Sequence, residues 1–164
     1  MKAFFKFSIF GFISLLLASC GTPQTPETIA QKLIVHYQKG DFQNATQLFL
    51  PQKEAYQVAE IIGTPKGFLK SNGLEGNSEY QSRIGQTLKA KRNVFKISWK
   101  QIKFKTLQVK TTKKHLESLE TLDALLLFQG EIIFQQPVRL IKFKGKFYLW
   151  QVAAFDRYRG NKSS

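Results

Sequence analysis

Residues 25–45, TPETIAQKLIVHYQKGDFQNA, predict two helices and the tight turn between them. Thr25 can cap the first helix, because its hydroxyl can accept a hydrogen bond from the first turn, and Pro26 suits the first helical position. Gly40 ends this helix, since glycine readily adopts the left-handed conformation of a C-terminal cap, and Asp41 can cap the next helix. Apolar side chains recur every three or four residues and form one stripe along the first helix, at Ile29, Ala30, Leu33, Ile34 and Tyr37.

The helical pattern continues toward the C-terminus as far as a glycine-rich segment. Residues 42–50 keep the helical spacing, Pro51 can open a third helix, and Gly63 ends it. Residues 63–79 are rich in Gly, Asn and Ser, which is typical of a loop. Residues 79–91 can form either a helix or a strand. The helical alternative rests on apolar residues spaced four apart, namely Tyr80, Ile84 and Leu88.

After Asn93 the apolar period changes from that of a helix to that of a strand. The alternating apolar residues change parity twice, and each change requires a β-bulge or a tight turn. Strongly bent sheets are built in this way. The three groups are Phe95, Ile97 and Trp99; Ile102 and Phe104; and Leu107 and Val109.

The C-terminal third predicts a central strand and a hairpin. Residues 125–134 are almost continuously apolar and predict the central strand, and residues 135–137, Gln-Gln-Pro, predict a turn. Residues 138–144 and 147–155 flank Gly145 as the two arms of the hairpin. Helices followed by antiparallel strands give an α+β fold, with the N-terminal helices packed in a strongly curved antiparallel sheet.

Two segments resemble the nuclear transport factor 2-like (cystatin-like) domains that occur in many bacterial lipoproteins. They are residues 26–45, a helix, a Gly-Asp-aromatic turn and a second helix, and residues 146–152, KFYLWQV, which are similar to the closing strand of that family. The resemblance implies one domain at residues 26–156, with a cone-shaped sheet around the first helix and an apolar pocket. The residues after it, 157–164, are polar and are expected to form a tail. The resemblance implies no activity, because that superfamily contains isomerases, cyclases, dehydratases and pure binding modules.

The N-terminus predicts export and lipid anchoring. Lys2 and Lys6 precede an apolar stretch that closes with Leu-Ala-Ser before Cys20, the only cysteine. This arrangement resembles the lipobox of bacterial lipoproteins, and residues 1–19 then form the signal peptide and 20–25 a tether. The alternative, an uncleaved membrane helix, is disfavoured because the apolar core is shorter than the ~20 residues that cross a bilayer. The resemblance implies acylation of Cys20 and, because Gly21 follows it, the bacterial outer membrane facing the periplasm.

The chain is strongly basic, with 25 Lys and Arg against 11 Asp and Glu and a formal net charge of +14. Residues 80–116 contain no acidic residue at all. A basic face is expected to bind anionic lipid, lipopolysaccharide or an acidic envelope partner, whereas an exported protein rarely meets nucleic acid. The alternative is that lysines only solubilise the sheet and protect its edge. The candidate binding residues are Lys96, Lys100, Lys103, Lys105, Lys142 and Lys144.

No catalytic residue, cofactor or metal is predicted from the sequence. His36 falls off the apolar stripe and His115 is expected in a basic loop without an orienting carboxylate. Asp123, Glu131 and Asp156 are the acids that could enter a cone, and a turn at 129–130 would expose Glu131. We expect a non-enzymatic binding or envelope-maintenance module, with an isomerase or dehydratase that uses the cone pocket as the alternative. The aromatic residues that would line that pocket, or else belong to the core, are Tyr37, Trp99, Phe134 and Trp150.

Overall fold

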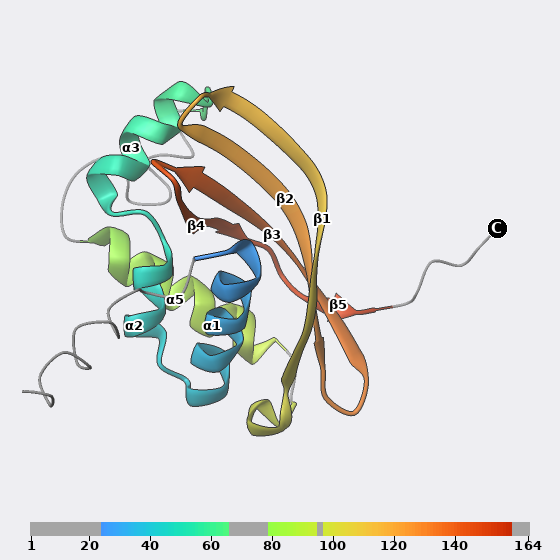
Figure 1. The fold of residues 1–164 in the computed structure, drawn as a ribbon. Coiled ribbons are helices and arrows are strands. Elements are labelled where there is room, and N and C mark those ends of the chain that lie inside the picture. The colour runs from blue at the N-terminus through green and yellow to red at the C-terminus, as the bar shows by residue number, and fades with distance from the viewer. Residues whose placement is uncertain (1–23, 66–78, 95–96, 159–164) are drawn as a thin grey trace, which may run out of the picture.

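The computed structural model describes residues 24–65, 79–94 and 97–158, and these form an α+β fold of helices and one open antiparallel sheet (Figure 1). Cys20, Lys96 and most of the glycine-rich loop lie outside these residues. The sheet order is β1-β2-β3-β4, with β5 paired to β3. The helices are α1 (Pro26–Lys39), α2 (Phe42–Ala45), α3 (Gln52–Ile61) and α5 (Glu79–Asn93), with single 3-10 turns η2 (Thr46–Leu48) and η3 (Trp99–Gln101). The strands are β1 (Lys103–Leu116), β2 (Leu119–Gln129), β3 (Ile133–Phe143), β4 (Lys146–Val152) and β5 (Asp156–Arg157).

The predicted helix ends are confirmed. Thr25 caps α1 in a reciprocal capping box with Thr28, and the stripe from Ile29 to Tyr37 is buried. Gly40 adopts φ +70° after α1, and the Asp41 side chain accepts from the backbone N–H of Asn44 at the start of α2. The segment left open between helix and strand is a helix, α5.

The strand expected around Phe95, Ile97 and Trp99 is wrong where the structure describes it. Phe95 lies outside the described residues, and Trp99 begins η3, so that β1 starts only at Lys103. The physical reason is a set of tertiary contacts that overrides the alternating pattern. The Trp99 indole N–H donates to the Arg92 carbonyl at 3.1 Å, and its ring lies 5.1 Å from that of Tyr37.

One of the two predicted parity changes, between Phe104 and Leu107, is confirmed as an irregularity in β1, whereas the other falls between η3 and the start of β1. Its pairing with β2 shifts register between Phe104 and Thr106, between Val109 and Thr111, and between Lys114 and Leu116. Each shift leaves one β1 residue without a partner opposite it, so β1 bends. The three residues are Lys105, Lys110 and His115. His115 therefore lies in a strand, and the prediction that it lies in a loop is wrong because β1 extends to Leu116.

The predicted central strand and the turn after it are also wrong. The chain turns instead at residues 130–132, where the Gly130 N–H donates to the Ile132 carbonyl, and Pro137 lies inside β3 opposite Leu125. Proline is tolerated there because the Pro137 carbonyl accepts from Ala153, on the side of β3 away from β2. In a strand the N–H and C=O of one residue point to the same side, so the missing N–H interrupts no bond with β2.

The hairpin of β3 and β4 is confirmed, and its two-residue turn has positive φ at Lys144 (51°) and Gly145 (79°), which suits the twist of the strands. The core lies on both faces of the sheet. Leu140 packs with α1 residues and its neighbour Ile141 packs with α3 residues, and successive strand side chains point to opposite faces. The concave face therefore holds α1, and α3 covers one end of the other face. Among the residues that the structure describes, the buried ones of this core lie between Ile29 and Phe155.

We expect Gly85→Ala to stabilise the fold. Gly85 lies within α5 beside α2, and a Cβ there would meet the Phe42 carbonyl oxygen at 3.6 Å, an ordinary van der Waals distance. Alanine in a helix interior is favoured over glycine by about 0.5–1 kcal/mol. Urea unfolding should show a free energy of unfolding that is higher by that amount. A lower value would mean that α5 and α2 pack too closely for a methyl group.

Candidate functional site

Three of the four expected pocket residues belong to one buried aromatic cluster on the concave face. Trp99 lies at its centre, with ring centroids 5.1 Å from Tyr37, 5.8 Å from Phe128 and 5.4 Å from Phe155. Phe134 stacks on Phe128 at 5.5 Å. All five residues are buried, so their rings fill the space between α1 and the sheet. The fourth residue, Trp150, is half-buried and lies apart from this cluster, on β4.

A buried polar contact borders the aromatic cluster. The Gln136 amide donates to the Tyr37 hydroxyl at 3.2 Å and to the Ala153 carbonyl at 3.0 Å, which ties β3 to α1 and to the segment after β4. Burial raises the pKa of Tyr37 well above its ordinary value, although the bond from Gln136 lowers it. Tyr37 therefore stays protonated at neutral pH and is unsuited to act as a base. This contact was not predicted from the sequence, because Gln136 was expected in a turn.

The most conspicuous surface feature is the outer edge of the sheet. Five lysines lie along this edge, and we call them the β1 lysines: Lys103, Lys105, Lys110, Lys113 and Lys114. All five are exposed, and β1 contains no acidic residue. Among the described residues no carboxylate lies within ion-pair distance of any of them. β1 is the end strand of the sheet, so these cations follow an edge without another strand beside it.

The structure divides five of the six predicted lysines between the two ends of the sheet, and the sixth, Lys96, lies outside the described residues. Lys100, in η3, is close in sequence to Lys103 and Lys105 at the start of β1, whereas Lys142 and Lys144 lie at the β3–β4 turn. The two groups lie at opposite ends of β1, because Lys103 pairs with Gln129 whereas Lys114 pairs with Glu120, which in turn pairs with Lys142. Lys142 is also partly engaged, 3.9 Å from Glu120 and over the ring of Phe147.

The lysines that join these two ends were missed as site residues. Lys110, Lys113 and Lys114 belong to the acid-free run of the sequence, but the last two were expected with His115 in a basic loop. Recognising that the strand continues to Leu116 would have placed them on the same edge. With them, positive charge extends along the whole of β1.

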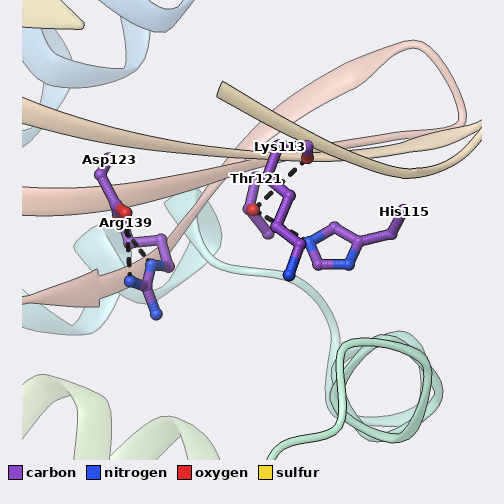
Figure 2. Close-up of polar contacts among 5 residues, drawn as sticks. All are labelled: Lys113, His115, Thr121, Asp123 and Arg139. Carbon is purple, nitrogen blue, oxygen red and sulfur yellow. Dashed lines mark hydrogen bonds and ion pairs between the residues drawn. The ribbon is translucent and has the colours of Figure 1, made fainter. Parts of the chain in front are cut away.

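The acids considered for catalysis do not converge. Asp123 on β2 holds Arg139 on β3 through two bonds of 2.6 and 3.2 Å on the convex face (Figure 2), and this hydrogen bonding raises the pKa of Arg139. Glu131 is exposed in the β2–β3 turn, as expected, and the exposed Asp156 carboxylate accepts from the backbone of Arg157. An isomerase or dehydratase therefore stays an expectation from the resemblance.

The two histidines occupy different surroundings. His36, near the end of α1, has its Nδ1 3.7 Å from the Asp41 carboxylate. A hydrogen bond from Asn44 holds the pKa of Asp41 below its ordinary value. His115 is within 3.0 Å of the Thr121 hydroxyl on the convex face, beside Lys113 (Figure 2). In the described part of the chain, no group of three or more His, Cys, Asp and Glu side chains could hold a metal ion.

None of the described helices is long and apolar enough to cross a membrane. Comparison of the chain with protein-family models, with curated proteins and with solved structures finds no match. The function is therefore argued from the residues and their arrangement alone.

We expect the pKa of His115 to lie below the ordinary histidine value of 6.5, first because burial disfavours the charged ring and second because Lys113 repels it. NMR titration of the ring should show this, and Lys113→Gln should raise the pKa only in part. Because the folded-state pKa is depressed, the stability from neutral His115 is present above pH 6.5 and is lost as the pH falls through the folded-state value. A His115 pKa at or above 6.5 would contradict this account.

Proposed function

We propose that the protein is a lipoprotein anchored through Cys20, and that the β1 lysines hold it against an anionic surface of the bacterial envelope. The single observation that supports the binding function is the exposed, acid-free edge of the sheet. Each Lys or Arg near an anionic lipid surface contributes about 1 kcal/mol of binding free energy. Five such residues on one edge suffice for measurable association without a specific pocket.

The form of β1 favours an anionic surface over pairing with another strand. Three register shifts interrupt β1, and lysines line it; both features discourage the addition of a further strand. A lipid headgroup, lipopolysaccharide or acidic polymer requires no such pairing. The flexible lysine side chains can reach phosphate or carboxylate groups along a bent edge.

We also propose that the domain is a nuclear transport factor 2-like cone. Two features support this: the helices precede the strands in the chain, and the sheet bends around α1 (Figure 1). In this proposal the cone serves as a compact support for the basic edge, in keeping with a non-enzymatic module. The outer membrane facing the periplasm, proposed from Cys20-Gly21, would supply the anionic surface.

We predict that Lys105, Lys110 and Lys114 together carry much of the binding. Replacing all three with Gln should weaken co-sedimentation with anionic liposomes at low salt by roughly a hundredfold, at ~1 kcal/mol for each lysine. The test uses residues 20–164 with Cys20→Ser, because the buried core lies within them. Binding should also fall as salt rises, since exposed charges are screened over ~8–10 Å at physiological ionic strength.

The matched control replaces Lys32, Lys39 and Lys53 with Gln. These three lysines are exposed on α1 and α3, and their replacement removes the same number of positive charges. It should retain most of the binding. Equal losses in the two variants would show that net charge, and not the β1 edge, is responsible. Equal binding to neutral vesicles would exclude an electrostatic surface altogether.

We predict that the mature chain begins at acylated Cys20. The intact mass of protein extracted from bacterial membranes should show loss of residues 1–19 and addition of acyl groups. Cys20→Ser should leave the precursor uncleaved. Unmodified protein that begins at another residue would disprove lipid anchoring at Cys20.

A further inference from the structure

His115 lies within the row of β1 lysines. It follows Lys113 and Lys114 directly, and the register shift between Lys114 and Leu116 leaves it without a partner opposite it on β2. Histidine is the side chain whose unperturbed pKa lets its charge change between pH 5 and 8. Among the residues of β1, all of which the structure describes, His115 is therefore the side chain that can change charge near neutral pH.

The surroundings of His115 favour the neutral ring. Its Nε2 lies 3.0 Å from the Thr121 hydroxyl of β2, a contact that a neutral imidazole satisfies as either donor or acceptor. The residue is half-buried on the convex face, and Lys113 lies beside it (Figure 2). Burial disfavours the charged ring first and Lys113 repels that charge second, so the pKa of His115 is lowered.

No acid among the described residues around His115 offsets this repulsion. The ionisable side chains of the neighbouring elements are Glu117 in the turn after β1, Glu120 and Asp123 on β2, Arg139 and Lys142 on β3, and Lys53, Glu54, Tyr56 and Glu60 on α3. None of these acids forms an ion pair with the ring, and two of them hold the β3 cations instead. Lys113 is therefore the charge that acts on His115 when no partner is bound.

An anionic surface against the β1 lysines would reverse this balance. Phosphate groups placed beside Lys113 and Lys114 attract the protonated ring and offset the repulsion by Lys113. Protonation adds one cation to the row, which strengthens attraction to the surface. The surface in turn raises the His115 pKa, because two linked binding equilibria affect each other equally.

We propose that His115 makes the attachment of the β1 lysines to an anionic surface sensitive to pH. Attachment is weaker while the ring is neutral and stronger once the ring is protonated. The added affinity appears as the pH falls below neutrality, and it is complete when the ring is charged in the unbound protein as well. This inference rests on the proposed function of the β1 lysines, because it concerns the regulation of the same edge.

The test measures binding to vesicles of phosphatidylcholine and phosphatidylglycerol at about pH 7.5 and at about pH 5, on either side of the ordinary histidine pKa. The phosphodiester of phosphatidylglycerol stays charged throughout, so the surface itself does not change. The protein is residues 20–164 with Cys20→Ser, which include the buried core. His115 should contribute about a fivefold gain in affinity at the lower pH, the effect of one further cation near an anionic surface.

His115→Gln should lose this fivefold gain, since glutamine is polar but has no charge at either pH. Other groups titrate equally in the two chains, so the comparison isolates His115. The chain has two histidines, and His36→Gln is the matched control because it leaves β1 unchanged. It should keep the pH dependence of the parent chain. NMR titration of the His115 ring should also give a higher pKa with nanodiscs of the same lipids than without them.

Equal pH dependence in His115→Gln and the parent chain would overturn the inference, and so would a His115 pKa that nanodiscs leave unchanged. Loss of the pH dependence in His36→Gln would overturn it as well. Binding at about pH 7.5 separates this inference from the proposed function, because the ring is then largely neutral. A parent chain that binds there through the β1 lysines keeps that function whatever His115 does, whereas a parent chain that binds at neither pH would overturn both.

Discussion

The contacts of Trp99 are the constraint on which the rest of the fold depends. Its ring joins α1, through Tyr37, to β2 and to the segment after β4, through Phe128 and Phe155. Its indole N–H holds the Arg92 carbonyl, and the Arg92 guanidinium in turn donates to the Tyr37 carbonyl. A sheet that surrounds these rings cannot stay flat. The register shifts of β1 supply the necessary bend, and they also bring basic residues into the positions that lack a partner.

Because aromatic rings fill the concave face, the candidate binding surfaces lie on the outside of the domain. The β1 lysines lie on the edge that bends most, and a groove between α5 and β4 lies along the other edge. The two sites differ in kind. The first is an open row of exposed lysines, and the second is a space enclosed between a helix and a strand.

Local chemistry predicted the helices well, because capping residues and the apolar stripe act within a few residues of one another. Thr25, Gly40 and Asp41 occupy the predicted positions, and the parity change between Phe104 and Leu107 predicted the first register shift of β1. The turn expected at Gln136 and Pro137 failed because both are accommodated by distant partners, Tyr37 and Ala153. A prediction that extended the strand as far as Leu116 would have placed the β1 lysines on one edge. The groove could not have been predicted from the sequence, since it depends on how α5 packs against α2.

The central claim is that the concave face is a packed core and not an open pocket, and Phe128→Ala tests it most directly. Phe128 is fully buried between Trp99 and Phe134. If the rings form a packed core, urea unfolding should show a loss of about 3–5 kcal/mol in the free energy of unfolding. The half-buried Phe147 is the control, and Phe147→Ala should cost clearly less. A loss below ~1 kcal/mol for Phe128→Ala would contradict the account, because a ring that only borders an open pocket can be removed cheaply.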